Sequence, residues 1–173
     1  KTMWQKINPP DADNLCTWAL RCLLAESGKR KVLIDCGMGN KQSEKFFSHY
    51  QPHGEATLIG SLQKAGLKPE DITDMFLTHL HFDHCGGAVR YNEKRELVTT
   101  FPNAVYWSTE AHWKWAVHPN SRERASFLTE NILPIKESGQ LQLVKEKDDT
   151  ELFSGFRLRF VYGHTEAMMI PLI

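Results

Sequence analysis

The stretch from Thr78 to Gly87 reads Thr-His-Leu-His-Phe-Asp-His-Cys-Gly-Gly and places three histidines and one carboxylate within six residues. It directly follows a short apolar run, which predicts a buried strand leading into it. On extended backbone, successive side chains point to opposite sides, so His79 and His81 emerge on the same side. Asp83 and His84 follow where the chain must turn. The stretch therefore gathers four side chains of the kind that ligate metals.

Imidazole nitrogens together with a carboxylate oxygen suit zinc, manganese or iron better than calcium or magnesium. The alternative is a polar loop that happens to be rich in histidine. Four ligand-type side chains at the spacing H-x-H-x-D-H argue against that alternative. The pair Gly86-Gly87 lets the backbone pass close to a neighbouring segment or a ligand. We therefore expect a metal site at the end of the strand that precedes Thr78.

The size and charge of the chain narrow the class of protein. Its 173 residues, 41% hydrophobic and 24% charged, describe one globular domain spanning residues 1–173. Lysine plus arginine equals aspartate plus glutamate, 21 against 21, so we expect no nucleic-acid partner. The apolar runs are shorter than the roughly 20 residues of a membrane helix. We expect a cytoplasmic protein without a membrane partner, and a homo-oligomer is left open.

Both ends of the chain suggest an incomplete piece. It starts at Lys1 without an initiator methionine, and it ends within the apolar run 168–173. A signal peptide upstream of Lys1 therefore stays open.

Hydrophobic periodicity predicts strand pairs, then helices, then strands, which is typical of a mixed α/β layered domain. The expected loop is 1–14, and the expected strands are 15–24, 31–35, 74–77, 104–107, 141–144, 151–153 and 156–161, the last three as an antiparallel meander. The expected helices are 41–50, 55–65, one starting near His84, one capped by Ser108 and running to Val117, and one capped by Asn120 or Ser121 and ending near Ile135.

Several motifs together resemble those of the metallo-β-lactamase-fold superfamily. They are the H-x-H-x-D-H motif at 79–84, Gly-His-Thr at 163–165 and Leu-Ile-Asp-Cys-Gly at 33–37. Segments 101–104 and 113–139 look closest to hydrolases related to acyl-homoserine lactonases. The resemblance implies a four-layer αββα sandwich, of which this chain would carry the first half and the start of the second.

The resemblance also implies roles for single residues. His79, His81 and His164 would hold the first metal ion, and Asp83 and His84 would hold part of the second. Asp83 is also the catalytic candidate. The complete protein would bind two zinc ions, with manganese or iron as alternatives.

The family's bridging aspartate and last histidine have no counterpart here, because neither residue type follows His164. The family often reads G-H-T-P-G-H at this point, whereas residues 163–168 are Gly-His-Thr-Glu-Ala-Met. The chain is either a piece of a longer hydrolase or a natural short form with a reduced metal site. The abrupt ends favour the piece.

Asp35 has two readings. It would orient a ligand histidine through that histidine's second ring nitrogen, as carboxylates usually do at metal sites, or it would only cap the loop after its strand. Thr78 and Thr165 have the same two readings, support of a ligand histidine or a turn residue, and the turn residue is favoured for both. The remaining histidines, at positions 49, 53, 112 and 118, are expected to be surface or loop groups.

The implied function is a metal-dependent hydrolase, in which metal-bound hydroxide attacks a small ester or lactone substrate. One alternative on the same fold is an iron-dependent enzyme of sulfur oxidation or redox relay. Another is a phosphodiesterase or nuclease, which the neutral composition disfavours. A third is a piece that binds metal poorly, because its second site is incomplete.

Overall fold

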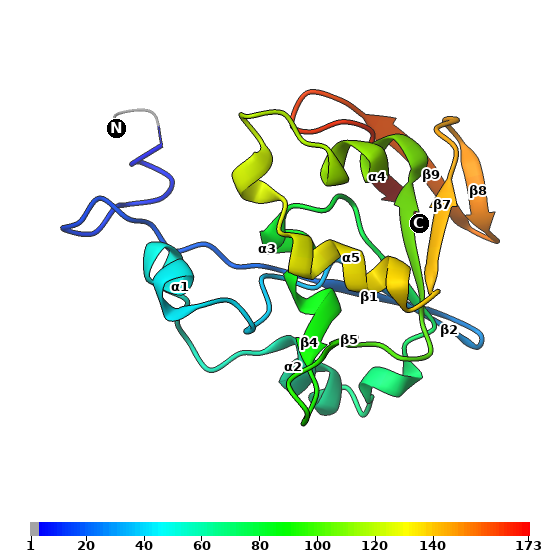
Figure 1. Ribbon diagram of the computed structural model, residues 1–173, viewed down its shortest axis with the longest axis horizontal. Helices are drawn as coiled ribbons and strands as arrows, with labels where there is room; N and C mark the ends of the chain where they lie inside the picture. The colour runs from blue at the N-terminus through cyan, green and yellow to red at the C-terminus, as the bar shows by residue number, and fades with distance from the viewer. Residues whose placement is uncertain (1–3) are drawn as a thin grey trace.

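A computed structural model of the chain describes residues 4–173, so the first three residues of the predicted loop and domain lie outside the described part. The mixed α/β class predicted from the sequence is confirmed. The strands form a five-stranded sheet, a three-stranded sheet and a two-stranded hairpin (Figure 1). Within the described residues, no helix is long and apolar enough to cross a membrane.

The five-stranded sheet has the order β1-β2-β3-β6-β7. Its strands are β1 (Leu23–Ser27), β2 (Arg30–Ile34), β3 (Asp74–Phe76), β6 (Val105–Thr109) and β7 (Leu141–Val144). The hairpin β1-β2 is antiparallel, as predicted, and turns at Gly28. The pairs β2-β3, β3-β6 and β6-β7 are parallel, so the carboxyl ends of four strands meet at one edge.

The three-stranded sheet has the order β10-β9-β8 and is antiparallel throughout. Its strands are β8 (Thr150–Phe153), β9 (Phe156–Val161) and β10 (Met168–Leu172), and the separate hairpin consists of β4 (Val89–Tyr91) and β5 (Leu97–Thr99). The helices are α1 (Glu44–Tyr50), α2 (Leu58–Lys64), α3 (Phe82–Cys85), α4 (Glu110–Val117) and α5 (Thr129–Glu137), with 3-10 turns at Pro69–Asp71, Gly86–Ala88 and Arg124–Ser126.

Side-chain alternation along the central strands builds two cores. Leu33 and Met75 point to one face of the five-stranded sheet and pack with Ile132 and Ile135 of α5, which lies over that face (Figure 1). Phe76 points to the opposite face and packs with residues of β9 and β10 in a second core. A helical layer, the five-stranded sheet and the three-stranded sheet therefore stack in that order.

Three sequence-based assignments of strands are corrected. The predicted strand 15–24 begins only at Leu23, because Trp18 and Leu20 pair with no strand and their side chains are 76% and 45% exposed. Strand β7 joins the parallel sheet instead of an antiparallel meander, because α4 and α5 provide the crossover that a parallel strand requires. The strands β4, β5 and β10 were not predicted.

Two predicted helix starts are also wrong. Strand β6 runs on through Ser108, so the cap of α4 is Thr109, whose hydroxyl accepts a hydrogen bond from His112 N at 2.9 Å. Helix α5 starts at Thr129 and not at Asn120 or Ser121. The intervening Phe127 has extended backbone, which lets its ring pack under the histidines described below.

Candidate metal centre

The candidate site lies at the carboxyl edge of the parallel strands. Asp35 follows β2, the histidine-rich stretch follows β3, and helix α4 follows β6. In α/β sheets, ligands bind outside the carboxyl ends of the parallel strands, where the loops that follow neighbouring strands lie next to one another. The loop between β9 and β10 delivers His164 to the same place, and the hydrogen bond from Met169 N to Thr78 O at 2.8 Å joins the two segments.

The structure brings His79, His81 and His164 together, although the last is far away in sequence. Their potential ligand atoms all lie within 4.8 Å of one another. The Nε2 atoms of His79 and His164 are 3.2 Å apart. His79 and His81 are buried, while His164 is exposed and leaves one side of the group open to solvent.

His81 Nε2 provides a test of whether a metal ion fits this group. It is buried and, among residues 4–173, has no hydrogen-bond partner. An unpaired buried nitrogen costs about 1–3 kcal/mol unless another group satisfies it. Burial lowers the pKa of both His79 and His81, so both rings are neutral near pH 7 and carry a free lone pair. Three imidazoles whose nitrogens lie this close together fit a divalent transition-metal ion.

Asp83 and His84 lie beside this group. Asp83 Oδ2 is 3.5 Å from His84 Nε2, and the rings of His84 and His79 are 4.0 Å apart between centroids. The short helix α3 carries both residues, so their side chains leave one helical turn together. Asp83 and His84 thus place two further potential ligand atoms next to the three histidines.

Asp35 links the three-histidine group to the pair of Asp83 and His84, on the side of the rings that faces away from the potential ligand atoms. Its carboxylate accepts a hydrogen bond from His84 Nδ1 at 2.7 Å and from the Thr78 hydroxyl at 2.9 Å. Because that hydroxyl donates its proton to Asp35, its oxygen accepts a hydrogen bond from the Nδ1–H of His79, at 3.0 Å. Both Nδ1 atoms are thus engaged, which leaves both Nε2 atoms free to bind a metal. Thr78 is therefore more than the turn residue that the sequence suggested.

The electrostatics of His84 reflect the same contact. Burial acts to lower its pKa, but the hydrogen bond and charge of Asp35, together with the charge of Asp83, outweigh burial and raise it. Asp35 holds this position with a φ of +56°, a backbone conformation that favours glycine over aspartate. A strained backbone beside a charged contact is typical of functional sites.

We expect Asp35→Asn to weaken zinc binding by about 10- to 100-fold, the usual effect of losing the partner of a ligand histidine. The amide can present an N–H to His84 Nδ1, which would move the ring proton to Nε2. Asp149→Asn is the matched control, because Asp149 also has a positive φ, of +59°, but is exposed on the turn before β8. Competition with a chromophoric chelator measures both affinities, and equal values would contradict the role of Asp35.

The prediction that His112 is a surface or loop group is wrong. The residue is 1% exposed instead of being a surface group. Its Nε2 accepts a hydrogen bond from Leu80 N at 2.8 Å, and its Nδ1–H donates to Glu166 O at 2.5 Å. Burial lowers its pKa to about 4, so the ring is neutral and can both donate and accept. His112 therefore ties the loop of His79 and His81 to the loop of His164.

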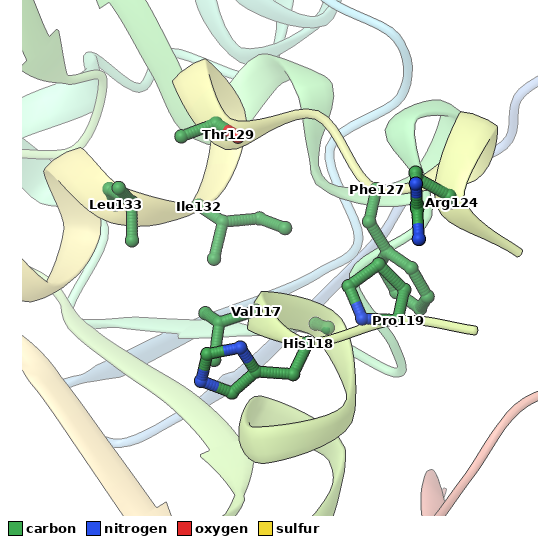
Figure 2. A pocket seen from close by; sticks show the side chains of 9 residues that line it. Val117, His118, Pro119, Arg124, Phe127, Thr129, Ile132 and Leu133 are labelled. Atoms are coloured by element: carbon green, nitrogen blue, oxygen red, sulfur yellow. The ribbon is translucent and has the colours of Figure 1, made fainter. Parts of the chain in front are cut away.

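A cavity of about 500 Å³ lies next to the histidines, between the end of α4 and the start of α5 (Figure 2). Val117, Ile132 and Leu133 give it apolar walls, and His118 and Arg124 lie at its border. Phe127 separates it from the metal group, since the ring packs 4.8 Å from that of His81 between centroids. The cavity is adjacent to the candidate metal centre and contains none of its ligands.

Comparison with known proteins agrees with this geometry. The chain is 27% identical over 169 residues to an N-acyl homoserine lactonase of Bacillus cereus, which covers 92% of this chain and 58% of that protein. The structure matches that of a probable metal-dependent hydrolase from Staphylococcus aureus, with a TM-score of 0.86 and 26% identity over 99% of this chain and 59% of the other. It also matches AidC, a dizinc quorum-quenching lactonase, with a TM-score of 0.63 and 26% identity over 87% and 50%.

The chain thus spans less than two thirds of the length of these relatives. The family model of the metallo-beta-lactamase superfamily matches residues 21–167, which include every candidate ligand and Asp35. On this match, and on the fold that carries it, the chain belongs to the metallo-β-lactamase superfamily.

Proposed function

We propose that this chain forms the metal-binding part of a hydrolase that acts on a small ester or lactone. The observation that carries the proposal is the convergence of His79, His81 and His164, with a buried and unpaired nitrogen on His81. The names of the relatives support the substrate class, since the Bacillus cereus protein is an N-acyl homoserine lactonase.

The residues divide into two ligand groups. His79, His81 and His164 would hold one ion, and Asp83 and His84 would contribute to a second. Zinc suits this donor set, and manganese or iron would be accommodated by the same atoms. When bound, zinc supplies a Lewis acid and lowers the pKa of a bound water to about 7.

Asp83 is the residue that we assign to catalysis. Its side chain is 36% exposed, so a substrate or an attacking water can reach the carboxylate. A carboxylate at hydrogen-bond distance from water orients the water and accepts its proton as the water attacks. Hydrolysis would break the acyl C–O bond: the oxygen of the water would end in the carboxylate, one of its protons would pass to the alcohol, and the other would be released to solvent. For a lactone, both products stay in one molecule.

We expect the full-length protein, loaded with zinc, to open N-acyl lactones and cleave small aryl esters. We further expect removal of the ions by a chelator to abolish turnover and re-addition of zinc to restore it. A panel of lactones, esters, thioesters and a phosphodiester, read by pH indicator or chromophore, measures this. A preference for the phosphodiester, or oxygen uptake that requires iron, would contradict the proposal in favour of the nuclease or the redox alternative.

A further inference from the structure

Glu123 lies on the segment between α4 and α5 and points toward the metal centre. Its side chain is only 13% exposed. Its Oε2 accepts a hydrogen bond from the Thr165 hydroxyl at 2.7 Å and from Trp115 Nε1 at 3.1 Å. Thr165 directly follows His164, and Trp115 belongs to α4. The carboxylate therefore joins a helix to the loop that carries the third histidine.

The same oxygen lies 3.6 Å from His81 Nε2. This distance is too long for a hydrogen bond, and the nitrogen is the buried, unpaired atom described above. Glu123 is also outside the group of histidines whose ligand atoms all lie within 4.8 Å of one another. The carboxylate thus stands beside the ligands without being one of them.

The negative charge of Glu123 lies close enough to the histidines to act on an ion that they bind. Imidazole ligands bring no negative charge to a divalent cation, and a carboxylate a few ångströms away stabilises the bound cation by charge attraction. The position of Glu123 is fixed by two donors, so little side-chain entropy is lost when an ion binds. Its backbone is held as well, because Glu123 N donates to Asn120 Oδ1 at 2.9 Å.

We propose that Glu123 is a positioning residue of the three-histidine metal site, where its fixed carboxylate stabilises the bound cation and holds the His164 loop against His81. This proposal rests on the metal binding of the proposed function, and not on the identity of the substrate. It assigns to a residue outside the histidine motif a role in ion affinity. A purely structural role would instead change the stability of the protein and leave ion affinity unchanged.

The test compares Glu123→Gln with Glu130→Gln in the full-length protein. The first substitution keeps the size of the side chain and an oxygen that can accept from Thr165, but removes the charge. Glu130 is a matched control, since it is also half-buried, lies seven residues further on, and contacts Gln42 instead of a histidine. Affinities for zinc and cobalt are measured by chelator competition, with the visible absorption of bound cobalt as a second readout and thermal unfolding of the metal-free protein as a third.

We expect E123Q to bind both ions about 10- to 100-fold more weakly, the range for partners of metal ligands, and to shift the cobalt absorption. E130Q should match the wild type in both. Wild-type affinity and spectrum in E123Q would overturn the proposal, as would a wild-type protein that binds neither ion. If E123Q does not fold, zinc affinity is measured for Glu123→Asp instead. Its side chain is shorter, so the carboxylate lies further from His81, and zinc binding should still be weaker than in the wild type. Because these readouts need no substrate, a failure to hydrolyse lactones would sink only the proposed function.

Discussion

Replacing His81 by alanine is expected to lower zinc affinity by more than about 100-fold, since the loss of a ligand exceeds the 10- to 100-fold effect of losing a ligand's partner. Hydrolysis by the full-length protein should fall below detection. The metal-free variant should remain folded, because the substitution removes a buried nitrogen that has no hydrogen-bond partner. The variant loses the packing of the imidazole ring against Phe127, His79 and His164. Equilibrium dialysis with metal analysis, together with a lactonase assay, measures both effects.

The control for this substitution is His49→Ala. His49 lies exposed in the last turn of α1, so its removal also deletes one imidazole from the chain but leaves the three-histidine group intact. We expect wild-type affinity and turnover from this variant. If the two variants bound zinc equally well, the convergence of His79, His81 and His164 would not be a metal site.

The sequence could predict those parts of the site that lie close together along the chain. His79, His81, Asp83 and His84 fall within one turn-forming stretch, so their spacing alone indicates common ligation. Local patterns also predicted the close approach of Gly86-Gly87 and the hairpin between β1 and β2. In each case, the physical constraint acts between near neighbours in sequence.

The roles of His112 and Glu123 could not be predicted from the sequence, because their contacts are distant along the chain. His112 meets Leu80, which is 32 positions away, and Glu123 meets Thr165, which is 42 positions away. Neither has a ligand-type residue at regular spacing, and only the packing of α4 against the carboxyl edge of the sheet brings them into place. A buried histidine that serves as both donor and acceptor leaves no pattern in a single sequence.

The misassigned strand at 15–24 has a related cause. Alternation of apolar residues shows which side chains would share a face, but not whether a partner strand covers that face. Residues 23–27 pair with β2, whereas Trp18 and Leu20 pair with no strand and are exposed. The parallel placement of β7 depends in the same way on a crossover that periodicity does not reveal.

Gly86→Ala is expected to destabilise the fold by about 3 kcal/mol or more, the upper range for overpacking. A Cβ atom on Gly86 would lie 2.1 Å from Met38 O, which is backbone and cannot rotate away. The loop after β2 would have to move off the helix that carries Asp83 and His84. At about 2–4 °C per kcal/mol for a chain of this size, the melting temperature should fall by about 6–12 °C. Zinc affinity should fall as well, because the displaced loop begins at Asp35.

Gly28→Ala is the control that distinguishes the effect of missing space at Gly86 from the effect of backbone strain. Gly86 has a φ of −60°, which any residue adopts, so its substitution tests space alone. Gly28 has a φ of +57° but nothing within 4 Å of an added Cβ, so its substitution should cost only about 1–2 kcal/mol of backbone strain. We expect G28A to melt a few degrees below the wild type and to bind zinc normally. Should G86A be no less stable than G28A, the contact between the two loops would not constrain the metal centre. A larger loss in G86A, accompanied by weaker zinc binding, would mean that the glycine pair packs the Asp35 loop against the ligands.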